Sequence, residues 1–311
     1  MTHFNDDDME ILGANDLNEL TEPELLGGDL SEALGSVSME LAPVEEPRAS
    51  EDREKRRVPF GQRVNKGGGV KTNVDVTIAI DITESMENLI GIIKDHVVHF
   101  RELVYEQLRE NMERKRKDRV LNRMRLRIIG FRDFKYDWEA FVQPWEGAMV
   151  SSEFFDLDDE YDCQALQEFV DKLVATGGED IPESGLEALH YAIRSDWDFE
   201  PGIAHRHVIM LFTDAPAHPL LRISERDEHY PDDENIPEDL VQLQTEFENE
   251  NLIGKDYRRL LIFAPVDEYP WNEISFWNAT TVSPTIAENG LEEIDLECII
   301  SALTGSIGAG V

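Results

Sequence analysis

The sequence predicts an α/β protein with a doubly wound, mostly parallel sheet and helices on both of its faces. Short β-branched apolar runs alternate along the chain with longer segments whose apolar residues recur at helical spacing. The short runs are apolar at consecutive positions, as in strands buried on both faces. With 311 residues, 41% of them hydrophobic, the chain has enough material for a core of one to two domains.

The predicted domain covers residues 73–308 and opens with the strand VDVTIAID at residues 74–81. A long helix is expected from about Met86 to Asp118, because apolar residues recur there every three to four positions. Further strands are expected at 124–134, 140–145, 205–216, 258–265 and 273–283. Further helices are expected at 163–175, 183–195, 237–250 and 291–307, with Gly305 as the stop signal of the last.

Residues 1–72 are predicted to be a disordered acidic tail followed by a basic, glycine-rich linker. Residues 1–47 contain thirteen Asp or Glu and no Lys or Arg, and such a segment buries too little apolar surface to offset its ordering entropy. An alternative is a partner-binding arm, because its isolated leucines suit short amphipathic helices. Basic residues follow from Arg48 to Lys71, and the glycines at 67–69 mark a flexible junction.

Charge and cysteine content narrow the class of partner and the compartment. A net charge of -37 argues against a nucleic-acid footprint, which needs a basic face, and favours basic proteins or metal ions. Cys163 and Cys298 are too few for a disulfide framework, and their helical surroundings indicate buried thiols in a reducing compartment. The first residues lack the features of a secretion signal, and no run approaches about 18 apolar residues. A cytoplasmic protein without a membrane span is expected.

Two strand ends carry oxygen-bearing side chains. Asp81, Thr83 and Ser85 form a D-x-T-x-S sequence at the end of the first strand, and Asp214 lies in the polar turn that ends the strand expected at 205–216. If these strands are parallel neighbours, the oxygens meet at one edge of the sheet and offer the ligands that Mg²⁺ prefers. The alternative is an ordinary helix cap, because Ser and Thr satisfy free amides at such turns.

Four segments in the same order resemble the von Willebrand factor A family. DVTIAIDITESM is similar to the family's first strand and metal loop. RIIGFRDF at 127–134, ATGGEDIPESGLEAL at 175–189 and VIMLFTDAPAH at 208–218 are similar to a cytoplasmic branch found beside atypical α-kinases. The resemblance implies a metal-ion-dependent adhesion site (MIDAS) that binds Mg²⁺, or alternatively Mn²⁺ or Ca²⁺, and a role in binding proteins.

By that resemblance Asp81, Thr83, Ser85 and Asp214 are metal ligands. The chain departs from the family in the middle loop, where the expected Thr is replaced by GGED. Asp180 is the candidate ligand there, with Glu179 as the alternative. A third carboxylate would tighten cation binding and weaken capture of an acidic partner side chain, so a purely structural ion stays an open alternative.

The leading functional hypothesis is an intracellular, metal-dependent protein-binding module within a multi-protein system, with an AAA+ ATPase or a kinase as the suggested partner. A non-enzymatic protein is expected, because no phosphate-binding P-loop, dinucleotide loop or nucleophile elbow is present in the sequence. One alternative is a metal-assisted phosphate-ester hydrolase using Asp81, Asp180 and Asp214. Another is a metal-free scaffold that acts through the acidic tail.

Several other residues have two interpretations each. Arg132 and Asp133 orient the middle loop or contact a partner, or else form a salt-bridged strand end. His218 is a base or outer ligand, or else polar surface. Nine Lys or Arg between residues 109 and 127 form a solvated helix end or dock an acidic surface. The segment 224–250 lines the metal face or simply packs a helix on the sheet.

Overall fold

The computed structural model describes residues 70–115, 119–134, 147–178 and 182–308. All of these lie within one unit, Val64–Val311. The predicted tail and most of the linker lie outside the described residues, as do Glu179, Asp180 and the strand expected at 140–145. The predicted boundary at residue 73 is close to the start of the first strand at Val70.

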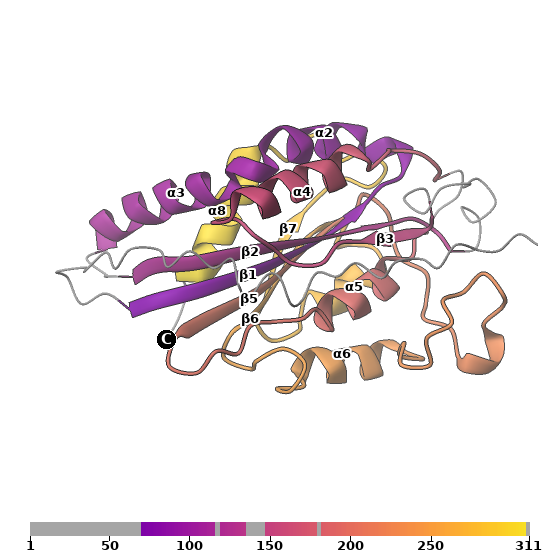
Figure 1. Ribbon diagram of the computed structural model, residues 1–311. Coiled ribbons are helices and arrows are strands. Elements are labelled where there is room, and N and C mark those ends of the chain that lie inside the picture. The colour runs from indigo at the N-terminus through magenta and orange to yellow at the C-terminus, as the bar shows by residue number, and fades with distance from the viewer. Residues whose placement is uncertain (1–69, 116–118, 135–146, 179–181, 309–311) are drawn as a thin grey trace, which may run out of the picture. The chain divides into compact units, whose positions relative to one another are not determined.

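A seven-stranded sheet forms the centre of the described chain (Figure 1). Its strand order is β3-β2-β1-β5-β6-β7, and β4 also pairs with β2. The contacts that join β2, β1, β5, β6 and β7 are parallel, whereas β3 and β4 run antiparallel to β2. The strands are β1 Val70–Asp81, β2 Arg119–Phe131, β3 Met149–Ser151, β4 Phe155–Asp156, β5 Ala204–Phe212, β6 Arg258–Ala264 and β7 Thr280–Pro284. The mostly parallel sheet predicted from the sequence is confirmed.

Helices cover both faces of this sheet, as predicted (Figure 1). One face carries α2 (Glu87–His96), α3 (Phe100–Lys115), α4 (Glu160–Asp171) and α8 (Leu296–Gly308). The other face carries α5 (Gly185–Ile193) and α6 (Leu240–Glu248), together with the short α7 (Trp271–Ile274).

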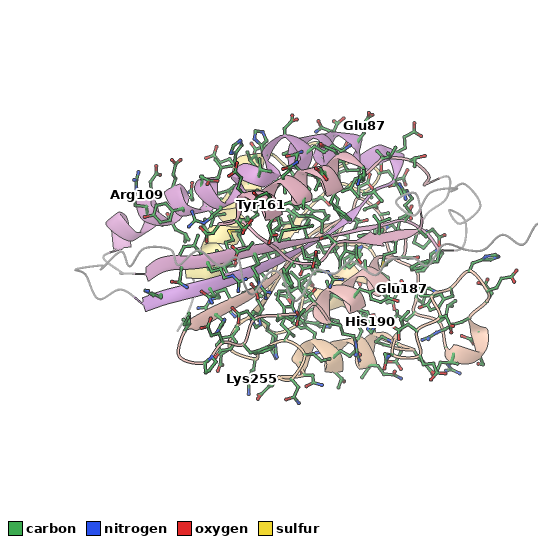
Figure 2. The ribbon with its side chains drawn as sticks, viewed as in Figure 1. Glu87, Arg109, Tyr161, Glu187, His190 and Lys255 are labelled. Carbon is green, nitrogen blue, oxygen red and sulfur yellow. The ribbon has the colours of Figure 1, made fainter. Side chains whose placement is uncertain are left out.

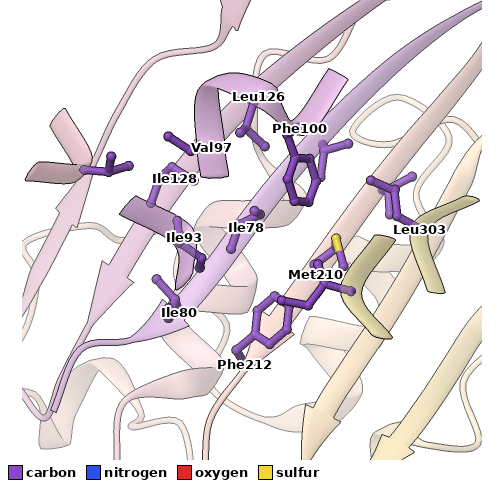
Figure 3. Close-up of a cluster of buried hydrophobic side chains, with 14 of the residues drawn as sticks. Ile78, Ile80, Ile93, Val97, Phe100, Leu126, Ile128, Met210, Phe212 and Leu303 are labelled. Atoms are coloured by element: carbon purple, nitrogen blue, oxygen red, sulfur yellow. The ribbon is translucent and has the colours of Figure 1, made fainter. Parts of the chain in front are cut away.

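Each face of the sheet has its own apolar core, because successive side chains of a strand point to opposite faces. Ile78 and Ile80 of β1 lie in the first core, where they pack with residues of α2 and α8 (Figure 3). Ala79, between them, lies in the second core with the apolar residues of α5 and α6. Each fully buried isoleucine contributes roughly 1.5–3 kcal/mol, and Ala79 adds apolar contact on the opposite face of β1.

The long helix expected from Met86 to Asp118 is instead two helices. A 3-10 turn at Val97–His99 separates α2 from α3, and the chain leaves α-helical geometry at His96, whose φ is −125°. The apolar spacing continues through the turn because Val97 and Phe100 are still buried. For this reason the break is invisible in the sequence pattern.

The second strand begins earlier than expected, at Arg119, and this changes the interpretation of the basic run. Arg123, Arg125 and Arg127 lie on β2 and not at a solvated helix end. Arg125 binds Asp75 through two hydrogen bonds of 2.8 and 2.7 Å. The helix-end interpretation is therefore wrong for these three arginines, whose charges are used within the fold.

Three smaller expectations also need correction or comment. Gly305 does not end α8, which continues to Gly308 with Gly305 on its exposed side. Cys298 is exposed on α8, contrary to the expected burial, whereas Cys163 is partly buried in α4. None of the helices in the described residues is long and apolar enough to cross a bilayer.

At the β7 edge of the described sheet, no residue of the strand is buried and the strand ends at Pro284.

Candidate metal centre

Asp81 and Asp214 meet at the carboxyl edge of the sheet. Asp81 is the last residue of β1 and Asp214 lies two residues after β5, and these strands are parallel neighbours with Ile80 paired to Phe212. Both carboxylates are buried, Asp81 completely and Asp214 to all but 3% of its surface. The two acidic residues that the sequence placed at separate strand ends are therefore brought together by the topology.

The loop after β1 folds back onto the Asp81 carboxylate. The backbone N–H and the hydroxyl of Thr83 both donate to Asp81 Oδ1, at 2.9 and 2.7 Å. Thr213 donates from Oγ1 to the other carboxylate oxygen at 2.9 Å. Both oxygens of Asp81 are thus oriented by hydroxyl groups, which fixes the side chain in one position.

A second set of contacts holds Asp214 beside the same loop. Ser85 donates from Oγ to Asp214 Oδ1 at 3.1 Å, and its hydroxyl lies 3.4 Å from that of Thr83. The backbone N–H of Gly290 donates to Asp214 Oδ2 at 2.7 Å. Two carboxylates and two hydroxyls predicted as ligands, Asp81, Thr83, Ser85 and Asp214, therefore form one connected cluster.

The cluster concentrates negative charge in a dry place. Burial raises the pKa of Asp81 to about 6, and the neighbouring Asp214 carboxylate also raises it, against hydrogen bonds from Thr83 and Thr213 that lower it. Among the described residues, no lysine or arginine forms an ion pair with either carboxylate. The described side chains therefore supply no positive charge to balance these two carboxylates.

The middle loop lies directly against the first metal loop. The Thr176 N–H donates to the carbonyl of Ile82 at 3.1 Å, and the Glu84 N–H donates to that of Gly177 at 3.3 Å. Gly177 and Gly178 both have a φ of 83°, which favours glycine, and a Cβ on Gly178 would lie 2.8 Å from that of Thr83. Gly178 is thus required for this close approach, and Gly177 suits the left-handed backbone beside it. Asp180 and Glu179 lie outside the described residues.

Arg132 holds the middle loop in place. Its buried guanidinium donates to the carbonyls of Val174, Thr176 and Gly147, at 2.6, 2.7 and 2.8 Å. This agrees with the interpretation that Arg132 orients the loop. The neighbouring Asp133 is buried, and its Oδ2 lies 3.1 Å from Nε2 of His218.

Three residues near the cluster were not singled out from the sequence. Thr213 and Gly290 contact the two carboxylates, as described above. Glu183 is buried, and its Oε1 would lie 3.6 Å from a Cβ on Gly178. Only Thr213 carried a local signal, because a hydroxyl beside Asp214 has the same kind of chemistry as the first loop.

The chemistry of the cluster suits a hard divalent cation. Its potential ligands are all oxygens, which Mg²⁺, Mn²⁺ and Ca²⁺ prefer, and its two carboxylates would balance a double positive charge. Within the described part of the chain, no group of three or more His, Cys, Asp or Glu is placed to hold a metal ion. Glu179 and Asp180, the candidates for a third carboxylate at this site, lie outside the described residues.

No protein-family model and no curated protein matches the sequence. Among solved structures, the pilus adhesin SpaC from Lactobacillus rhamnosus GG is 12% identical over 76% of this chain, with a TM-score of 0.44. Proximal thread matrix protein 1 from the mussel byssus, in a form with a zinc-occupied MIDAS motif, is 11% identical over 74%, with a TM-score of 0.36. The chain spans 30% and 46% of those two chains. Likenesses this loose assign neither a family nor a function.

Proposed function

We propose that this chain is a divalent-cation-dependent protein-binding module whose docking surface is the carboxyl edge of the sheet. The observation that carries the proposal is the convergence of Asp81, Thr83, Ser85 and Asp214 from two strand ends into one hydrogen-bonded cluster. The four-segment resemblance to von Willebrand factor A domains also supports it. A bound cation would supply a positive charge and open coordination positions at this edge.

The surroundings of the cluster suit a protein partner. Ser85 and the neighbouring Glu84 are exposed, so the cluster is open to the surface on this side. Val174 and Ile286, in the loops that flank it, expose 47% and 65% of their surface. Exposed apolar side chains such as these can be buried by a protein that docks at this edge. An AAA+ ATPase or a kinase in a multi-protein system is the partner class that the resemblance suggests.

We also propose a reducing compartment such as the cytoplasm. Cys163 and Cys298 are both free thiols in the structure, and neither forms a disulfide with the other. This supports a compartment in which thiols stay reduced.

The cation site is tested by calorimetry on the full chain. Mg²⁺, Mn²⁺ and Ca²⁺ are titrated into the natural protein, into Asp81→Asn and into the control Asp95→Asn, which changes an exposed carboxylate on α2. We expect saturable binding in the natural protein and the control and none in Asp81→Asn. Equal binding heats in all three proteins would exclude this cluster as the cation site.

Partner binding is tested separately from cation binding. The product of a neighbouring kinase or ATPase gene is passed over the immobilised full chain in Mg²⁺ and in EDTA. We expect binding in Mg²⁺ that is lost in EDTA and in Asp81→Asn. Cation binding without any effect on partner binding would leave a structural ion and refute the docking role.

A metal-assisted phosphate-ester hydrolase is a second candidate, favoured by one observation. His218 follows Asp214 by four residues, and its imidazole is positioned by the buried Asp133 carboxylate. A histidine held in this way can take a proton from water. Turnover of p-nitrophenyl phosphate in Mg²⁺ or Mn²⁺, lost in both His218→Asn and Asp81→Asn, would promote this candidate. No turnover by the natural protein would discard it.

A further inference from the structure

The segment between His218 and α6, residues 219–239, forms a separate cover over α5. We call it the insertion. It folds around the Arg226 guanidinium, which donates to the carbonyls of Leu221, Asp233 and Ile236 at 3.1, 3.0 and 2.6 Å. The same guanidinium lies 5.0 Å from the centre of the Tyr230 ring. The insertion is therefore held together by contacts of its own.

Two polar contacts and three buried side chains, Leu220, Ile236 and Pro237, fasten the insertion to the body of the domain. Tyr230 donates from its hydroxyl to Glu187 Oε1 on α5 at 2.8 Å. Asp233 Oδ2 lies 3.9 Å from Nε2 of His190, one helical turn further along α5. Ile236 is 2% exposed in the core beneath. Glu187 and His190 are both labelled beside α5 in Figure 2.

Glu187 is an unusual group to find at such a contact. Its side chain is 2% exposed, and its second oxygen, Oε2, has no hydrogen-bond partner among the described residues. A protonated carboxyl tolerates this position, whereas an ionised one would place an unpaired charge in a dry environment. The titratable groups that face it are Tyr230 from the insertion, His218 from the loop after β5 and Asp133 from the loop after β2.

We propose that Glu187 is a proton-controlled latch that holds the insertion closed on α5 when protonated and releases it when ionised. Release lets water reach the carboxylate and removes the repulsion from Asp133. The latch works near neutral pH, because burial raises the pKa of Glu187 to about 7 from an ordinary 4.5. The hydrogen bond from Tyr230 and the charge of His218 oppose this rise.

The sign of the effect follows from the two pKa values. The closed form binds the proton more tightly, so closure is fully favoured below pH 4.5 and weakens until the pH passes about 7. Between pH 5.5 and pH 8 the opening equilibrium should shift by about 30-fold toward the open form. Because the insertion begins five residues after Asp214, opening would alter the surface next to the candidate metal centre without requiring a bound cation.

Hydrogen exchange of the full chain tests the latch. Exchange of peptides from residues 219–239 is measured at pH 5.5 and pH 8 by mass spectrometry and corrected for the intrinsic pH dependence of exchange. We expect the opening equilibrium of the natural protein to rise about 30-fold. Glu187→Gln, which keeps an acceptor for Tyr230 but does not ionise, should show almost no rise. The control Glu248→Gln, an exposed residue of α6, should behave like the natural protein.

Either of two results would overturn the proposal. One is an insertion whose corrected exchange is the same at both pH values in the natural protein. The other is a rise that persists unchanged in Glu187→Gln. If Glu187→Gln does not fold, Tyr230→Phe replaces it, because loss of the hydroxyl that favours the ionised form raises the pKa of the closed form and should make the rise in opening between pH 5.5 and pH 8 larger. A rise in Tyr230→Phe that is no larger than that of the natural protein would equally refute the latch.

Discussion

Replacing Gly290 by alanine adds only one methyl group, but it should strongly disturb the candidate metal centre. Gly290 has a φ of 58° and donates its N–H to Asp214 at 2.7 Å. A Cβ at this position would lie 2.1 Å from the backbone oxygen of Ser85, a contact that only a backbone shift can relieve. The shift would pull the N–H away from Asp214 and separate the two loops that form the site.

Gly202 provides a matched control. Its φ is 87°, but a Cβ there would meet nothing within 4 Å. Both variants carry the strain of alanine in a left-handed conformation, about 1–2 kcal/mol. Gly290→Ala adds the loss of a hydrogen bond to a charged acceptor, about 1.5–3 kcal/mol, and the displaced loop. We therefore expect Gly290→Ala to be less stable than Gly202→Ala by about 2–4 kcal/mol.

Urea unfolding of both variants in EDTA measures this difference, and calorimetry with Mg²⁺ measures its effect on the site. Cation binding should weaken in Gly290→Ala and stay unchanged in Gly202→Ala. The reasoning is refuted if the two variants lose the same stability to within about 0.5 kcal/mol. It is also refuted if Gly290→Ala keeps the cation affinity of the natural protein.

Three further predictions follow from the described contacts. Arg132→Met leaves three carbonyls without their donor, so we expect a loss of about 3 kcal/mol or more by urea unfolding and faster proteolysis near residues 174–178, with partial recovery in Arg132→Lys. Burial lowers the pKa of His207 to about 4, so its contribution to stability is full above pH 6.5 and lost as the pH falls through 4, opposite in sign to that of Glu187. As the pH rises from 4.5 to 6.5, the stability of His207→Gln relative to the natural protein should therefore fall by about 2 kcal/mol, and that of Glu187→Gln should rise by about 2 kcal/mol; parallel pH profiles of the three proteins would contradict this. Mg²⁺ at a hundred times its dissociation constant should stabilise the natural protein by about 2.7 kcal/mol and leave Asp81→Asn unchanged, and an equal shift of the urea midpoint in both would place the ion elsewhere.

The sequence predicted best those strands whose formation depends on their own residues and not on distant partners. β1, β5 and β6 were predicted because their runs of apolar residues serve both faces of the sheet. β3 and β4 were missed because three and two residues are too few to show any periodicity. The start of β2 at Arg119 was missed because its alternating arginines look like a solvated segment until their acidic partners are known.

The same distinction applies to the candidate metal centre. Asp81, Thr83, Ser85 and Asp214 were found because each lies at or shortly after the end of a recognisable strand, and the parallel pairing of β1 and β5 brings them together. The contact of Thr213 with Asp81 spans 132 residues of sequence, and that of Gly290 with Asp214 spans 76. No local pattern encodes such distances, so these partners depend on the completed fold. Ligation of a cation by the cluster stays a prediction.

β7 lies at an edge of the sheet and offers few free backbone groups with which a further strand could pair. Leu260 donates to Ala279 and Thr285 to Ala264, so alternate residues of β7 face β6 and the remaining backbone groups of Thr280, Val282 and Pro284 face outward. Thr280 uses its N–H on Trp277, and Pro284 has none. Among the residues of β7, only Val282 then has a backbone N–H free to bond to another strand. This edge of the sheet is therefore a poor template for aggregation, and a protein partner is more easily bound at the loops.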